Sequence, residues 1–233
     1  MKLAVIQPVY FADIITLAKT AAADFVVWAD TFMFSRHSTI NRARIKTAEG
    51  ARWLTAAVIG GEGMPIEKVL LKGDVVHHCR TLEVNYQNSP YYFYLADEVN
   101  ELLQQPQQFL NRLCKESFLF LCRNMAISRP IVDASALPIV KDRTQRVIAW
   151  LQETGCDEYL VEQSKVDLIR SDEIEKCGFR VWPLVYEAPR YHQLYGNFIP
   201  DLSGLDLLFN EGEQSRYFLQ EAVKSSTFIE SIA

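Results

Sequence analysis

The chain has 233 residues, of which 49% are hydrophobic and 23% are charged, so it is long and apolar enough to bury a sizeable core. Its formal net charge of −5 gives no general electrostatic attraction for nucleic acid or for an anionic membrane surface. No apolar run approaches the roughly 20 residues needed to span a bilayer, and the N-terminal apolar stretch is too short for a signal peptide. We therefore expect a cytoplasmic protein with no membrane insertion and no nucleic acid partner.

The chain opens on a predicted strand, loop, helix and strand. Residues 2–7 and 25–28 are apolar runs typical of strands, and the apolar positions within residues 14–22 fit one face of a short helix. Such a unit favours a parallel sheet with a right-handed crossover. Ligands of that architecture bind at the carboxyl ends of the strands, which here are the turn at residues 7–11 and the segment after residue 28.

The next segment, residues 31–50, is basic within an acidic chain. It is either a solvated surface or an element that binds anions. Residues 53–59 and 69–76 then predict two strands of a hairpin connected through the glycines of residues 60–63. The spacing of these glycines is typical of a turn and lacks the pattern of a phosphate-binding loop.

The pattern becomes helical from residue 77 to residue 123, and two packed helices, residues 91–103 and 109–122, are its simplest interpretation. The alternation of strands and helices then resumes, with strands at 131–132, 159–161 and 179–182 and helices at 143–153 and 172–177. We predict a single Rossmann-like α/β domain over residues 1–233, with a mostly parallel sheet flanked by helices and a helical insert at about 77–125.

The residue types that bind metals are scattered. Five cysteines without a CxxC pair argue against a zinc site and against a disulfide framework. His77 and His78 are adjacent, and adjacent side chains point in different directions on a helix or a strand. The sequence therefore predicts no metal site, and it does not identify a cofactor. It also lacks the standard nucleophile-elbow, metalloprotease and Walker signatures.

A first group of candidate site residues follows the first two strands. Gln7 and Asp30 are expected at neighbouring strand ends, and Tyr10 precedes the first helix. Asp30 is a candidate general base, a role that places it within about 3.2 Å of an acceptor hydroxyl or amine. Alternatively, Asp30 caps a turn and Gln7 closes a loop. The polar residues of the next segment, which could hold a phosphate or carboxylate, complete this group: Arg36, Asn41, Arg42, Arg44 and Lys46.

A second group lies in residues 186–212, a segment dense in aromatic and polar side chains. Tyr191 and Gln193 are candidates for a pocket lining, with an ordered loop as the alternative. His192 is a candidate general base because imidazole titrates near neutral pH, although no partner for it is identifiable. Ser203 is expected to cap a short helix that contains Asp206.

Two blocks of the sequence resemble the WbqC-like protein family. The N-terminal block contains Gln7-Pro8-x-Tyr10-Phe11, Asn41-Arg42-x-Arg44-Ile45-Lys46-Thr47 and Trp53-Leu54-Thr55. The C-terminal block contains Tyr191-x-Gln193-x-x-Gly196-x-Phe198-x-Pro200 and Ser203-x-x-Asp206-x-Leu208-Phe209-Asn210-x-Gly212. The order and spacing of these motifs extend the resemblance over roughly residues 1–212.

The resemblance implies a transferase of bacterial surface-polysaccharide, O-antigen-type biosynthesis. Such an enzyme would move an amino-acid or acyl-type group onto a sugar or sugar-nucleotide acceptor, so the expected partner is a small molecule such as a sugar nucleotide. The positions that match the family motifs become candidates for substrate binding: Gln7, Tyr10, Asn41, Arg42, Arg44, Lys46, Tyr191, Gln193 and Asp206.

Departures from the family pattern leave other functions open. Residues 12–15 replace a proline and an aromatic run, Thr31 replaces a second acid after Asp30, and residues 161–163 replace a Ser-Gly loop. One alternative is a non-catalytic ligand-binding or assembly protein that retains the fold. A further alternative is a nucleotidyltransferase, against which stands the absence of a histidine pair after the first strand.

Overall fold

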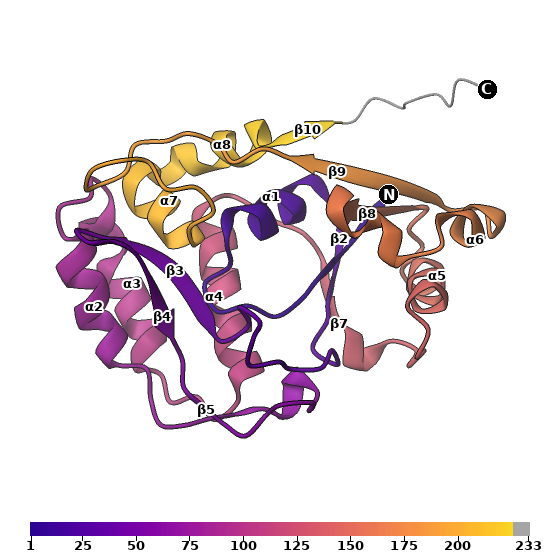
Figure 1. Ribbon diagram of the computed structural model, residues 1–233, viewed down its shortest axis with the longest axis horizontal. Coiled ribbons are helices and arrows are strands. Elements are labelled where there is room, and N and C mark those ends of the chain that lie inside the picture. Colours follow the sequence, from indigo (N-terminus) through magenta and orange to yellow (C-terminus); the bar gives the residue numbers. More distant parts are fainter. Residues whose placement is uncertain (226–233) are drawn as a thin grey trace.

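The computed structural model describes residues 1–225, and its centre is a six-stranded sheet in the order β10-β9-β8-β1-β2-β7 (Figure 1). Five neighbouring strands, from β9 to β7, are parallel, and β10 pairs with β9 in the antiparallel direction. This confirms the predicted Rossmann-like fold with a mostly parallel sheet. The strands are β1 (Lys2–Ile6), β2 (Phe25–Trp28), β7 (Ile131–Asp133), β8 (Glu158–Glu162), β9 (Arg180–Tyr186) and β10 (Val223–Ser225).

Capping residues fix the ends of α1 and α5, two of the helices that alternate with these strands. The carboxylate of Asp13 accepts a hydrogen bond from the Thr16 amide and caps α1, and Asp142 caps α5 in the same way. Gly155 ends α5 with a φ of 66°, a left-handed conformation that favours glycine. The helices are α1 (Ile14–Ala22), α5 (Arg143–Thr154), α6 (Ser171–Lys176), α7 (Gly204–Glu211) and α8 (Ser215–Glu221); α8 and β10 were not predicted.

The sheet buries both of its faces, as a parallel sheet with helical crossovers requires. Ala4 and Ile6 of β1 belong to a large hydrophobic cluster with α1, α4 and α7. Leu3 belongs to a second cluster, which packs against α5. Figure 1 shows α5 and α6 at one end of the molecule. At the opposite end lie the hairpin of β3 (Arg42–Thr47) and β4 (Gly50–Thr55) and the helices α2 (His77–Tyr86) and α3 (Tyr92–Gln104).

The predicted insert contains three helices instead of two: α2 (His77–Tyr86), α3 (Tyr92–Gln104) and α4 (Leu110–Asn124). The boundaries of α3 and α4 agree with the prediction to within a few residues. The prediction missed α2 because its buried residues, His78, Leu82 and Tyr86, include two polar types. Their spacing of four residues is nevertheless helical.

The predicted hairpin of residues 53–59 and 69–76 is confirmed only in part, because residues 58–59 pair with residues 70–71 in the antiparallel direction and the rest of the two segments does not. The main hairpin joins β3 (Arg42–Thr47) to β4 (Gly50–Thr55), whereas β5 (Val58–Ile59) and β6 (Leu70–Leu71) form only a two-residue pair. Strand β3 was hidden because charged residues alternate with buried Ala43 and Ile45. The 3-10 helices are η1 (Ile66–Lys68), η2 (Ala134–Ala136), η3 (Gln163–Leu168) and η4 (Gly212–Gln214). Within residues 1–225, no helix has the length and apolarity to cross a bilayer.

Candidate functional site

The candidate site lies where the strand order reverses. From β1 the chain proceeds to β2 and β7 on one side, and then returns to β8 and β9 on the other side. Strands β1 and β8 are paired only from Lys2 to Ala4 and from Glu158 to Leu160, so their carboxyl ends separate. A cleft of about 680 Å³ opens there. Carboxyl ends at such a switch point are the usual ligand site of open α/β sheets.

The cleft is lined from both faces of the sheet and is mainly cationic. Helix α1 contributes Lys19 from one face, α5 contributes Arg143 and Arg146 from the other, and η3 contributes Lys165. These four cations face two carboxylates, Asp13 and Glu162. The excess of positive charge, within a chain of net charge −5, favours an anionic ligand. The aromatic part of the lining consists of Phe32, Trp150 and Tyr159.

Lys19 occupies the gap between the two diverging strands. The Ile6 carbonyl accepts a hydrogen bond from the Ala29 amide beyond β2, so the alternation of the strand directs the Val5 carbonyl toward β8. Lys19 Nζ donates to that carbonyl at 3.0 Å and lies 3.6 Å from Glu162 Oε1. The lysine therefore bridges the carboxyl ends of β1 and β8 where their backbone pairing has ended.

Burial lowers the pKa of this lysine. Desolvation lowers the pKa of Lys19 to about 8, although the neighbouring Glu162 opposes the shift. Glu162 also pairs with the exposed Lys165 at 2.7 Å, so its charge is shared between two amines. An amine that carries or loses a proton close to pH 8 can accept a proton from a bound hydroxyl or amine.

Gln7 is the predicted site residue that lines this cleft. The register of β1 and β2 pairs Ile6 with Trp28, which confirms that Gln7 and Asp30 follow neighbouring strand ends. Asp30 is nevertheless buried, and its two carboxylate oxygens accept hydrogen bonds from the Ser135 amide (2.9 Å) and hydroxyl (2.7 Å). It thus caps η2 and is absent from the lining of the cleft. Its catalytic role stays a prediction.

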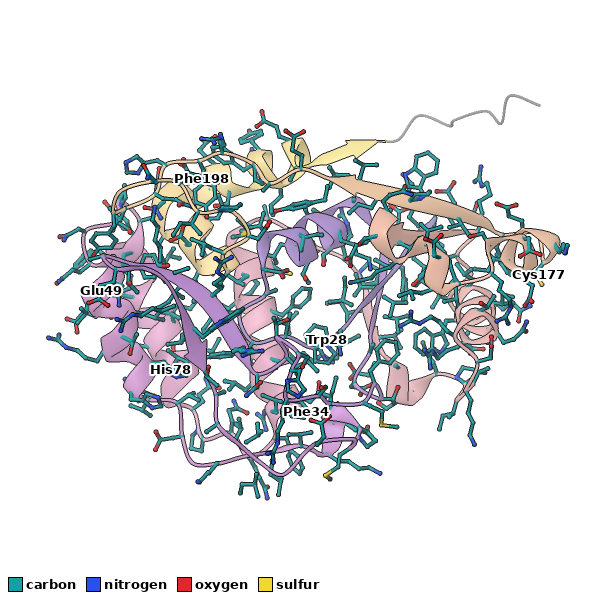
Figure 2. The ribbon with its side chains drawn as sticks, in the orientation of Figure 1. Trp28, Phe34, Glu49, His78, Cys177 and Phe198 are labelled. Carbon is teal, nitrogen blue, oxygen red and sulfur yellow. The ribbon has the colours of Figure 1, made fainter. Side chains whose placement is uncertain are left out.

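Tyr10 lies in the core and is not among the residues that line the cleft. Its hydroxyl is 2.9 Å from Nδ1 of His78, which is also buried. Figure 2 shows His78 at the end of the molecule that carries the hairpin, opposite Cys177. Burial lowers the pKa of His78 to about 4, with the adjacent His77 lowering it further and a hydrogen bond to the backbone of Thr55 opposing the shift.

The low pKa of His78 predicts that the protein loses stability in acid. Because the pKa is about 4 in the folded state and 6.5 ordinarily, the unfolded chain binds the proton more tightly. Neutral His78 makes its full contribution to the free energy of unfolding above pH 6.5. This contribution decreases by up to about 3 kcal/mol as the pH falls toward 4. Urea unfolding of His78→Gln should show a smaller loss of stability between pH 6.5 and 4.5 than the native chain. An equal loss of stability in both proteins would contradict this prediction. His37→Gln, at an exposed histidine, is the control.

Four predicted residues form a buried polar network near the hairpin. Lys46 Nζ donates to Gln193 Oε1 (3.0 Å) and to the Asn197 carbonyl (2.7 Å). Asp206 accepts from the hydroxyls of Tyr86 (2.9 Å) and Tyr191 (2.8 Å). Burial lowers the pKa of Lys46 and raises that of Asp206. None of these four predicted residues lines the switch-point cleft. They are Lys46, Tyr191, Gln193 and Asp206.

The remaining predicted residues also lie outside the lining of the switch-point cleft. Arg42 stacks 4.9 Å from the centroid of the Trp53 ring and donates to the backbone carbonyls of residues 37 and 38. Asn41 donates to the Ala56 carbonyl at 2.8 Å. Arg36 and His192 are exposed, and Arg44 is partly buried. The side chain of Arg44 makes no hydrogen bond or ion pair within residues 1–225. The predicted residues thus occupy several separate places, and their binding roles stay predictions.

Sequence reasoning missed the charged residues of the cleft, although each left a signal. Lys19 lies on the apolar side of α1, where it resembles an ordinary cation in the last turn of a helix. Arg143 and Arg146 lie in the first turn of a predicted helix, which is the unfavourable end for positive charge. Glu162 ends a strand that only the folded sheet places beside β1.

The parallel sheet and the cleft at its switch point, whose charged lining residues are mainly cationic, define a Rossmann-like α/β protein. The chain belongs to the WbqC-like protein family, whose sequence model matches residues 7–217. The uncharacterized protein Rv1507c of Mycobacterium tuberculosis is 27% identical to it over 203 residues, which cover 84% of this chain and 87% of that protein. The resemblance found in the sequence motifs is confirmed.

Proposed function

We propose that this chain is a transferase that binds an activated, anionic small molecule and its acceptor in the switch-point cleft. The acceptor would be a sugar or sugar nucleotide of surface-polysaccharide synthesis, and the transferred group an acyl or amino-acid group. The observation that carries this proposal is the position of Lys19, which is buried between the Val5 carbonyl and Glu162 and lines the cleft.

Lys19 in its neutral form would act as the general base. It would take the proton from the acceptor hydroxyl or amine while that oxygen or nitrogen bonds to the carbonyl carbon of the donor. The bond from the carbonyl carbon to the leaving group then breaks, and the ammonium returns the proton to the leaving group. Gln7, exposed at the edge of the same cleft, would orient the acceptor through its amide.

The proposal is tested with a panel of ligands and paired substrates. Sugar nucleotides, nucleoside triphosphates, acyl-CoAs and amino acids are first ranked by thermal stabilisation, because a ligand at 100 times its Kd should add about 2.7 kcal/mol. Donor and acceptor pairs drawn from the hits are then assayed for transfer by mass spectrometry. Transfer by the native chain and by His192→Ala, with no transfer by Lys19→Met, is the expected result.

The same assay addresses the earlier hypothesis for Asp30. Asp30→Ala removes the acceptor of both Ser135 bonds, so we expect it to lose about 1–3 kcal/mol of stability. Turnover per folded molecule should persist if Lys19 is the base. Its complete loss in folded Asp30→Ala, together with an active Lys19→Met, would reverse the assignment.

A non-catalytic ligand-binding protein is the second candidate. The observation in its favour is that the carboxylates of Asp30 and Asp206 are both occupied by hydrogen bonds within the protein. Binding of a panel member without transfer to any acceptor would support this function. Turnover of a nucleoside triphosphate would instead support nucleotidyl transfer.

A further inference from the structure

The α5 side of the cleft carries two arginines, Arg143 and Arg146, that lack an ion-pair partner within the described chain. Arg143 and Arg146 are three residues apart in the first turn of α5, so their side chains lie on the same side of the helix, and both line the cleft. Neither forms an ion pair within residues 1–225. The acid that precedes them, Asp142, pairs with Arg170 instead.

The guanidinium of Arg146 is held in place beside two aromatic rings but is incompletely hydrogen-bonded. Its Cζ atom lies 4.8 Å from the centroid of Phe32 and 5.5 Å from that of Trp150, and the two rings are within 18° of parallel. It donates through Nη1 to the Val140 carbonyl, whereas its Nε is buried and has no partner. A buried donor without a partner costs free energy. Nη2 also makes no hydrogen bond within residues 1–225 and, unlike Nε, is not buried, so it is the donor that an oxygen of a ligand can reach.

The position of these arginines also opposes the stability of the helix. The amino-terminal end of a helix carries partial positive charge, and the first turn of α5 contains two arginines and no acid. Residues that weaken the local structure in this way are expected mainly at functional sites. A bound anion would meet both guanidinium groups and the positive end of α5 together.

We infer that Arg143 and Arg146 form a subsite for the phosphate or diphosphate of the small molecule that binds in the cleft. This inference rests on the proposed function, because it assigns a ligand class to the same cleft. Two guanidinium groups one helical turn apart, each able to make paired hydrogen bonds, suit the several oxygens of a diphosphate. Lys19 lies on the opposite face of the sheet, so the reacting group would extend from this subsite toward α1.

Pyrophosphate tests the subsite without any knowledge of the reaction. Its binding should change the fluorescence of Trp150, which lies beside Arg146, and Trp150→Phe should remove the signal while calorimetry still detects binding. Arg143→Gln and Arg146→Gln should each raise the Kd at least about tenfold, since charge-assisted hydrogen bonds are lost. Arg80→Gln, at an exposed arginine of α2, is the control and should leave the Kd unchanged.

A second readout separates a ligand site from a structural role. Removal of a cation from the first turn should raise the Tm of ligand-free Arg143→Gln by about 1–3 °C while pyrophosphate binding weakens. Unchanged affinity in both arginine variants, or no binding by the folded native chain, would overturn the inference. Succinate that binds as tightly as pyrophosphate would overturn the assignment to the phosphate class.

These outcomes are distinct from those of the transferase proposal. Arginine-dependent pyrophosphate binding without turnover of any substrate pair would support the subsite and overturn the transferase. Turnover that survives both arginine substitutions would overturn the subsite and leave the transferase intact.

Discussion

Replacement of Asp206 by alanine is expected to lower the free energy of unfolding by about 3–5 kcal/mol. Asp206 is fully buried, and its two oxygens accept the hydroxyls of Tyr86 and Tyr191. Alanine leaves both phenols without their acceptor in the core. It also removes the negative charge that raises the pKa of buried Lys46 against the effect of desolvation.

Urea unfolding at pH 7 measures this loss. Asp206→Asn keeps one oxygen as an acceptor, so its loss should be smaller than that of the alanine variant. Asp201→Ala is the matched control, because Asp201 also accepts a tyrosine hydroxyl, that of Tyr186, but is exposed. It should lose less than about 1 kcal/mol. A loss of similar size in Asp201→Ala and Asp206→Ala would contradict the structural role of the buried network.

The network connects three distant parts of the sequence. Tyr86 ends α2, Lys46 is the penultimate residue of β3, and Tyr191 precedes α7. The Tyr86 hydroxyl also accepts a hydrogen bond from the Lys46 amide at 2.9 Å. Figure 2 shows Phe198, from the loop whose Asn197 carbonyl accepts a hydrogen bond from Lys46, in the same half of the molecule as Glu49 of the hairpin turn. The C-terminal block of family motifs, residues 191–212, therefore holds this loop against the β3–β4 hairpin.

The alternating elements were predictable because their signals are local. The strands at residues 2–6 and 25–28 are short apolar runs, and α1 and α5 follow capping aspartates that the sequence displays. The hairpin was not predictable in the same way. Its strand β3 carries Arg42, Arg44 and Lys46 on one face, and period-two alternation with charged residues resembles a solvated loop.

The place of the site was predictable, but most of its residues were not. The carboxyl ends of the first strands were expected to bind ligands, and Gln7 does line the cleft there. The order of a parallel sheet is set by packing between segments far apart in the sequence. Nothing local indicates that β8 lies beside β1, and this pairing is what brings Glu162 to Lys19. The side chain of Asp30 points elsewhere because Ser135 offers it two donors.

Substitution of Lys19 by methionine is expected to reduce kcat by about 10²- to 10⁴-fold if the amine is the general base of the transfer reaction. The rate of the native enzyme should rise with pH and level off above about 8, because only the neutral amine accepts a proton. Lys19→Arg keeps a positive charge that does not titrate in this range, so it should fold and yet be inactive. Lys165→Met, at an exposed lysine of the same cleft that pairs with Glu162, is the matched control and should retain activity within about tenfold.

The lowered pKa of Lys19 also predicts how stability depends on pH, which can be measured without a substrate. Its pKa is about 8 in the folded protein and 10.5 ordinarily, so the unfolded chain binds the proton more tightly between these values. The contribution of Lys19 to stability therefore rises as the pH increases from about 8 to 10.5, by up to about 3 kcal/mol. Urea unfolding across this range should show the rise in the native chain and a smaller one in Lys19→Met. If both proteins show the same slope, the amine is not desolvated by the cleft and cannot be the base that the transfer reaction requires.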